Sequence, residues 1–432
     1  MNRKEILMVI SILAIVLLLA LIPVLARGIV SEGLLIGPEP YEAINGTGTA
    51  FSWMLGIIKS VLGLKAALTA AKAIPIASII LGGFMLFLIL RLERSRIVSL
   101  LALTFFISSS AAISAMLRFG DYATHFLLAS LGILIFTRKR AWPFSVIPLI
   151  IMCRSSPAFG LAILVGIFIF SAKRYLVRSL AVCLVSGLVG ISVQGLVTVP
   201  GQKLLIADFG AITGVSIFTL LAAFGGMFVI WNRRTTMAGY YLFLAAVAAG
   251  FWLWPSEYAL LLAAISSIFA AFAVERLLVM KWQFNLIKHL TLLTIACGVL
   301  FSLLVTLDTL TVSQPDSLMV QSWLSLSRMP KGNVLSLEEY GPWIRSFSGQ
   351  EHSIQTSDAY EIFYAVELKK AKTVLAENNI SYIWINDEMK NGRIWHQPEE
   401  GLLFLLRNNE TFNKVYQHAG IEIWEVANLS LS

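Results

Sequence analysis

The chain has 432 residues, of which 57% are apolar and only 13% are charged, and its mean hydropathy is +0.79. Soluble domains carry about 25% charged residues, so this composition excludes an ordinary soluble protein and indicates a helical protein of the lipid bilayer. The formal net charge is +8, but no basic patch interleaved with aromatic residues accompanies it, so we expect no nucleic-acid partner.

Apolar stretches long enough to cross a bilayer follow one another through most of the chain. The first is residues 6–26, and its length favours an uncleaved anchor over a signal peptide. The others are residues 68–90, 97–115, 125–137, 146–153 with 157–171, 180–199, 210–231, 237–252, 258–274 and 290–307. Since a spanning helix needs about 17 to 25 residues, we predict about eleven transmembrane helices. Residues 1–307 are thus the predicted membrane domain.

Short loops rich in lysine and arginine alternate with loops poor in both. The basic clusters lie at residues 3–4, 91–96, 138–140, 173–178, 233–234 and 281–288. Because such loops stay in the cytoplasm, the N-terminus is predicted to be cytoplasmic. An odd number of spans then places the C-terminal residues outside. We therefore predict a multi-pass protein of the plasma membrane with an extracytoplasmic C-terminal domain.

The first external loop contains Glu39-Pro40-Tyr41, shortly after the first apolar stretch. Charged groups at the outer ends of membrane helices are candidates for function. Glu39 is therefore a candidate catalytic residue, and a solvated loop glutamate is the alternative.

The second external loop contains Asp121 and His125, which a helix would place on one face because they are four residues apart. A carboxylate with an imidazole suits Mn²⁺ or, with more bound water, Mg²⁺. The alternative is that Asp121 caps a helix and His125 contacts solvent or neighbouring residues. Arg118, and Arg154 before the helix break at Pro157, are the cations placed to hold a phosphate.

The composition turns polar from about Asp308, so residues 308–432 are predicted to form a small α/β domain. A strand entering a turn is expected just before Glu338-Glu339-Tyr340-Gly341. The other expected elements are a helix at 358–377, a strand at 380–385, a helix at 399–408, and strands at 412–416 and 421–426 joined by a turn at Ala419-Gly420.

The order of these features resembles the catalytic subunits of oligosaccharyltransferases, which belong to the GT-C superfamily of polyprenyl-phosphate-dependent glycosyltransferases. In that family a strand leads into Trp-Trp-Asp-Tyr-Gly at the start of the exported domain. Here Tyr340 and Gly341 match, Glu339 keeps the acidic position, and both tryptophans are missing. The resemblance implies a GT-C-like fold, with an acidic first loop, metal ligands in the second loop and a C-terminal exported domain.

The resemblance also implies roles for individual residues. Glu39 would be the catalytic carboxylate and would share a metal ion with Asp121 and His125. The acceptor would be bound by the motif residues Glu339, Tyr340 and Gly341.

Two features of the family are absent. The late external loop, residues 197–210, lacks the expected glutamate, and Asp208 more simply caps a helix. The stretch 252–258 contains Glu257 but no phosphate-binding arginine. Arg118 and Arg154 are therefore the expected ligands of the donor phosphate.

The predicted function is transfer of a sugar or oligosaccharide from a polyprenyl-phosphate or diphosphate donor to a protein or glycan acceptor at the outer membrane face. Mn²⁺ or Mg²⁺ is the expected cofactor. One alternative is a catalytically degenerate member that acts as a scaffold or lipid-binding subunit, which the missing glutamate, arginine and tryptophans fit as well as an active enzyme does. Another is a transporter or flippase of lipid-linked sugars, which would have more polar groups within the spans.

Overall fold

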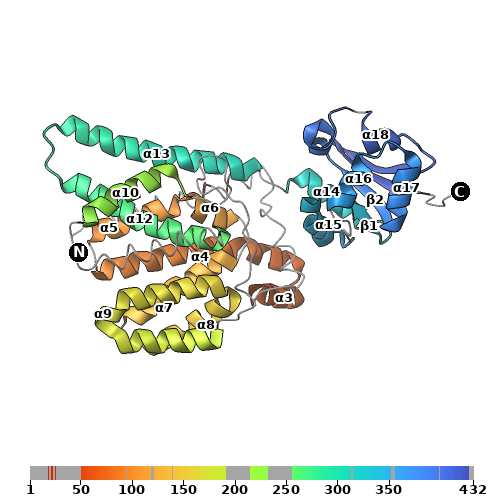
Figure 1. Ribbon diagram of the computed structural model, residues 1–432. Helices are drawn as coiled ribbons and strands as arrows, with labels where there is room; N and C mark the ends of the chain where they lie inside the picture. Colours follow the sequence, from red (N-terminus) through yellow and green to blue (C-terminus); the bar gives the residue numbers. More distant parts are fainter. Residues whose placement is uncertain are drawn as a thin grey trace. The chain divides into compact units, whose positions relative to one another are not determined.

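The computed structural model describes residues 50–93, 95–117, 121–138, 140–190, 215–231, 255–312, 315–351, 356–397 and 399–427, together with Leu18, Leu21, Ile22 and Leu25. These residues form two compact units (Figure 1). The helical unit ends with helix α13, and the C-terminal unit begins with helix α14.

The helical unit consists of apolar helices. They are α3 (Ala50–Leu62), α4 (Leu64–Glu93), α5 (Arg96–Ile107), α6 (Ser110–Leu117), α7 (Asp121–Thr137), η1 (Trp142–Ser145), α8 (Val146–Ser155), α9 (Pro157–Gly190), α10 (Ile217–Trp231), α12 (Pro255–Val279) and α13 (Asn285–Val312). Among the described residues, three segments are long and apolar enough to cross a membrane: Thr69–Leu92, Tyr258–Val279 and Asn285–Leu310. Helices α5 and α6 would add a fourth if their 54° bend lies within one span. The count of about eleven spans stays a prediction.

Close helix packing in this unit depends on small residues. Gly226 of α10 lies directly against the backbone of Phe269 in α12, and a methyl group at this position would collide with the Phe269 carbonyl oxygen. Gly160 of α9 likewise faces Cys153 of α8, whose Sγ would lie 2.6 Å from an added Cβ. Glycines of this kind let two helix backbones approach closely, which is how membrane helices gain van der Waals contact.

The predicted helix break at Pro157 is present. Helix α8 ends at Ser155, Ser156 is extended (φ −140°, ψ 93°), and α9 begins at Pro157. Proline suits a first helical position because its missing N–H would have no partner there. Since Gly160 contacts Cys153, the second helix folds back along the first.

The C-terminal unit is a small α/β domain. Its elements are α14 (Ser317–Leu326), β1 (Asn333–Leu335), η4 (Glu338–Tyr340), α15 (Gly341–Ser348), α16 (Thr356–Phe363), α17 (Leu368–Glu377), β2 (Ile380–Ile385), η5 (Met389–Arg393), α18 (Gly401–Leu405), β3 (Phe412–His418) and β4 (Ile421–Val426). The sheet has the order β1-β2-β4-β3, in which only β1 and β2 are parallel. The predicted strands at 380–385 and 421–426 are confirmed.

The turn between β3 and β4 is also confirmed. Ala419 and Gly420 both have positive φ, 43° and 81°. Such a two-residue turn matches the twist of the flanking strands, and glycine adopts the conformation without strain. The strand before it continues to His418, two residues beyond its predicted end.

The helix predicted at 358–377 is instead two helices, α16 and α17. The first helix ends at Phe363 because the residues at its end form hydrogen bonds with Ile394 and Trp395. The Trp395 indole N–H donates to the Phe363 carbonyl at 2.8 Å, and the Tyr364 hydroxyl donates to the Ile394 carbonyl at 3.0 Å. These partners are distant in sequence, so helical periodicity alone could not reveal the break.

One face of the sheet carries an ion cluster around Glu422 of β4. Lys390 Nζ lies 3.1 Å and Lys414 Nζ 3.4 Å from its Oε1, and the Trp424 indole N–H donates to Oε2 at 2.9 Å. Burial raises the pKa of this carboxyl, but Lys390, Trp424 and Lys414 outweigh burial, so the pKa is lowered overall. The charged form therefore stabilises the folded unit.

Candidate functional site

His125 is the one predicted metal ligand whose side chain the structure describes. It lies in helix α7, four residues after Asp121, so the predicted placement on one helix is confirmed for the backbone. Its ring is 4% exposed and lies 6.1 Å, centroid to centroid, from Phe159 at the start of α9. Glu39 and Arg118 lie outside the described residues, as does the side chain of Asp121.

The contact between His125 and Phe159 relates two predicted site segments. Phe159 follows the α8–α9 break by a few residues, and Arg154 precedes that break in the last turn of α8. The break and His125 therefore lie at the same end of helices α7, α8 and α9. Arg154 is exposed there, outside the packed interior of the helical unit.

The buried Nδ1 atom of His125 has no hydrogen-bond partner among the described residues. A buried polar atom without a partner costs about 1 to 3 kcal/mol, so such an atom calls for a ligand or another group. An imidazole nitrogen in this state fits a metal ligand. Among the described residues, no three His, Cys, Asp or Glu side chains lie close enough together to hold a metal ion. A metal site at His125 would therefore need side chains outside the described residues, and Glu39 and Asp121 are the predicted ones.

In the C-terminal unit, the motif residues Glu339, Tyr340 and Gly341 form the turn η4 and the start of α15. Tyr340 is fully buried, with its ring 4.9 Å from the Trp384 ring, centroid to centroid. Its hydroxyl accepts a hydrogen bond from Asn386 Nδ2 at 3.0 Å and donates one to Glu388 Oε2 at 3.1 Å. Glu339 is the exposed side chain of the motif.

Arg393 joins the motif to the segment that follows β2. Its guanidinium pairs with Glu339 and, at 3.1 Å, with Glu388. Burial lowers the pKa of Arg393, but the two carboxylates outweigh it and raise the pKa overall. The result is a surface network of one cation between two anions, directly above the buried tyrosine.

Sequence reasoning missed Asn386, Glu388 and Arg393, although one signal for the first two was present. β1 and β2 are parallel neighbours, so the residues after β1 meet the residues after β2 at one edge of the sheet. Asn386-Asp387-Glu388 is a polar run placed directly after a buried strand. Parallel pairing of β1 with β2 would have predicted its contact with Tyr340.

Aromatic residues pack beneath this edge. Trp323 of α14 is stacked on Trp343 of α15, 6.0 Å between centroids, and lies 5.6 Å from Trp384. The Trp384 indole N–H donates to Ser322 at 2.9 Å. The motif lacks the two tryptophans of the family, but tryptophans from other elements of the C-terminal unit form an aromatic core around Tyr340.

No protein-family model and no curated protein matches the sequence. Solved structures do. The oligosaccharyltransferase AglB from Archaeoglobus fulgidus, in complex with an inhibitory peptide and a dolichol-phosphate, has a TM-score of 0.65 at 12% identity over 100% of this chain and 75% of that one. The Archaeoglobus fulgidus oligosaccharyltransferase in complex with Zn and sulfate has a TM-score of 0.63 at 13% identity over 87% and 68%.

ArnT from Cupriavidus metallidurans, in the apo state, is also similar, with a TM-score of 0.51 at 11% identity over 98% of each chain. At these identities the likeness establishes the fold, and it extends over both the helical unit and the C-terminal unit. The GT-C-like fold implied by the resemblance is thereby confirmed. The protein has the fold of these solved structures.

Proposed function

We propose that the protein is a membrane glycosyltransferase that transfers a sugar or oligosaccharide from a polyprenyl-phosphate or diphosphate donor to a protein or glycan acceptor at the outer membrane face. The observation that carries this proposal is the GT-C fold over the full chain. AglB, one of the similar proteins, has been solved with a dolichol-phosphate and a peptide. The N-terminus would be cytoplasmic and the C-terminal unit extracytoplasmic.

The proposed catalytic centre consists of Glu39, Asp121 and His125. The unpartnered Nδ1 of His125 supports a metal-binding role, and the Zn and sulfate complex of the Archaeoglobus fulgidus enzyme is consistent with a cation in this fold. A bound Mn²⁺ or Mg²⁺ would offset negative charge on the leaving phosphate. Glu39 would polarise or deprotonate the attacking group of the acceptor, as a general base does.

Two further groups of residues complete the proposal. Arg118 and Arg154 would bind the donor phosphate, because a guanidinium matches phosphate oxygens with paired hydrogen bonds. The segment Glu339, Tyr340 and Gly341 would bind the acceptor, with the exposed Glu339 as the contacting side chain. Tyr340 would hold that segment in place through Asn386 and Glu388.

The experiment is glycosyl transfer in membranes, with radiolabelled polyprenyl-linked donors and added Mn²⁺. Wild type is compared with Glu39→Ala, Asp121→Ala and His125→Ala, and His289→Ala is the matched control because His289 is exposed on α13. We expect loss of transfer in the first three variants and normal transfer in the control. No transfer by the wild type with any donor would contradict the proposal and favour the degenerate, scaffold-like alternative.

Binding of Mn²⁺, measured by electron paramagnetic resonance, tests the metal site without relying on activity. We expect the bound-ion signal of the wild type to be lost when all three candidate ligands are replaced, while size-exclusion chromatography reports that the variant is still folded. A bound-ion signal that survives the triple replacement would refute the assignment of these ligands.

A further inference from the structure

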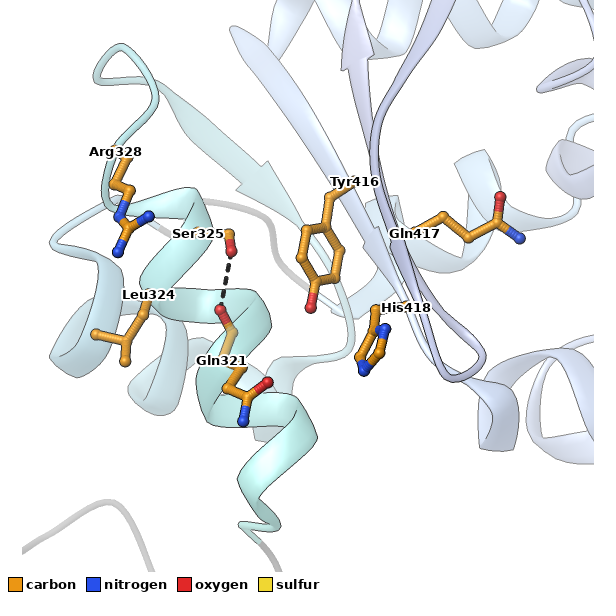
Figure 2. Close-up of a pocket in the computed structure, with 7 residues that line it drawn as sticks. All are labelled: Gln321, Leu324, Ser325, Arg328, Tyr416, Gln417 and His418. Carbon is orange, nitrogen blue, oxygen red and sulfur yellow. Dashed lines mark hydrogen bonds between the residues drawn. The ribbon is translucent and has the colours of Figure 1, made fainter.

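The C-terminal unit contains a hollow of about 430 Å³ between helix α14 and strand β3, far in sequence from any of the proposed catalytic residues of the helical unit. Gln321, Leu324, Ser325 and Arg328 line it from α14 and the turn that follows, and Tyr416, Gln417 and His418 line it from β3 (Figure 2). The four residues of the first group recur at helical spacing, so they form one stripe on the helix. The hollow is open to solvent, and Gln321, Leu324, Arg328 and His418 are exposed side chains.

A β-bulge aims the β3 side chains into this α14–β3 hollow. Lys414 pairs with Trp424 whereas Tyr416 pairs with Ile423, and Val415 is the extra residue between them. Because Ile423 and Trp424 are adjacent, they point to opposite faces, and so do Lys414 and Tyr416.

The side chains confirm this exchange of faces. Gln417 accepts a hydrogen bond from Lys414 at 3.1 Å on the far face, and Figure 2 shows its side chain pointing away from α14. Tyr416 and His418 point toward the helix in the same view. Bulges of this kind occur beside binding sites because they redirect side chains.

The lining offers hydrogen-bonding groups that other described residues do not use. The phenol of half-buried Tyr416, the amide of Gln321, the imidazole of His418 and the guanidinium of Arg328 have no side-chain partner among the described residues. The Ser325 hydroxyl donates to the Gln321 carbonyl at 3.0 Å, so its oxygen can still accept. Burial raises the pKa of Tyr416, which keeps its phenol a donor.

The charge of the lining selects the class of ligand. Among the described residues, Arg328 is the one formally charged side chain of the lining, and no carboxylate lines the hollow. A guanidinium without a protein partner binds a planar carboxylate through two parallel hydrogen bonds. The ring of Tyr416 and the side chain of Leu324 provide apolar area, and the remaining groups suit hydroxyls.

We propose that the α14–β3 hollow binds an acidic saccharide, with its carboxylate on Arg328, one face of a sugar ring on Tyr416, and its hydroxyls on Gln321, Ser325 and His418. The inference does not rest on the proposed glycosyl transfer. A protein that binds such a ligand without any transferase activity would satisfy it equally well.

The test is calorimetric titration of the full chain in phosphatidylcholine nanodiscs, which contain no sugar-based detergent. Cellobiouronate, cellobiose and acetate are the probes, because the first two differ only in the carboxylate. We expect cellobiouronate to bind at least about tenfold more tightly than either of the others, as a charge-assisted bidentate pair requires. If cellobiouronate and cellobiose bound equally tightly, the proposal that the ligand is acidic would be overturned. If acetate bound as tightly as cellobiouronate, the proposal that the ligand is a saccharide would be overturned.

Variants locate the site. Arg328→Gln should weaken cellobiouronate binding by about tenfold or more, whereas Arg345→Gln is the matched control because Arg345 is an exposed arginine on α15 outside the hollow. Tyr416→Ala should weaken the binding of both cellobiouronate and cellobiose. Tyr416→Phe, which keeps the aromatic ring, should retain the stacking contribution and replaces the alanine variant if that variant does not fold. Binding that is unchanged in Arg328→Gln and in both Tyr416 variants would overturn the proposal.

Discussion

Replacement of Tyr340 by phenylalanine tests whether the hydrogen bonds of Tyr340 with Asn386 and Glu388 hold the segment 339–341 in place. The variant removes the hydroxyl that accepts from Asn386 at 3.0 Å and donates to Glu388 at 3.1 Å. Asn386 is 2% exposed, so its amide would be left buried without this acceptor. A buried group without a partner costs about 1 to 3 kcal/mol. Glu388 is exposed, so water can replace the lost hydrogen bond and its contribution to the free-energy cost is small.

We therefore expect Tyr340→Phe to destabilise the C-terminal unit by about 2 kcal/mol, which corresponds to roughly 30-fold faster amide exchange in β2 when exchange reports unit opening. Hydrogen–deuterium exchange of the full chain, followed by mass spectrometry of peptides covering β2, measures this. Tyr364→Phe is the control, because its hydroxyl donates to the Ile394 carbonyl at 3.0 Å but its side chain is half exposed. Equal exchange in wild type and Tyr340→Phe, or an equal loss of protection in both variants, would refute the reasoning.

Three other predictions concern charge and packing. Arg393→Gln should cost less than about 1 kcal/mol in exchange-derived stability, and the loss should shrink in high salt, because its pairs with both carboxylates are exposed. The lowered folded-state pKa of Glu422 stabilises the C-terminal unit above about pH 4.5 and this contribution is lost as the pH falls through that lowered pKa, so Glu422→Gln should flatten the acid side of its thermal stability profile. Gly226→Ala should lower the melting temperature of the purified protein because its methyl group meets the Phe269 carbonyl, whereas Gly225→Ala, with 3.8 Å to the nearest atom, should leave it unchanged.

Local sequence patterns predicted the C-terminal unit well where the decisive contacts are local. The buried run at 380–385 and the Ala419-Gly420 turn are both present. The helix at 358–377 was wrong as one element because Phe363 and Tyr364, where the first helix ends, hydrogen-bond to Trp395 and Ile394. Periodicity reports the average environment of a face and carries no information about such distant partners.

In the candidate site, too, local spacing was predictable from the sequence and contacts between distant segments were not. The spacing of Asp121 and His125 was enough to place them on one helix, because four residues make about one turn. The contact of His125 with Phe159 required the fold-back of α9 on α8, which depends on the close approach of Gly160 and Cys153. Sequence alone could therefore suggest the pair Asp121 and His125, but not that the α8–α9 break, which follows Arg154, lies at the same end of these helices.

The bulge in β3 shows why binding surfaces are harder to predict than the strands that carry them. Lys414, Tyr416 and His418 alternate in sequence, so a regular strand would place all three on one face. One extra residue, Val415, moves Lys414 to the opposite face, where it lies 4.6 Å from the Trp424 ring centroid, and leaves Tyr416 and His418 facing α14. The strand assignment is insensitive to that residue, but the chemistry of both faces depends on it. If Lys414 faced the hollow, it would add a second basic side chain beside Arg328 and change which ligands bind there. The ligand class therefore depends on the strand register, which only the pairing of β3 with β4 reveals.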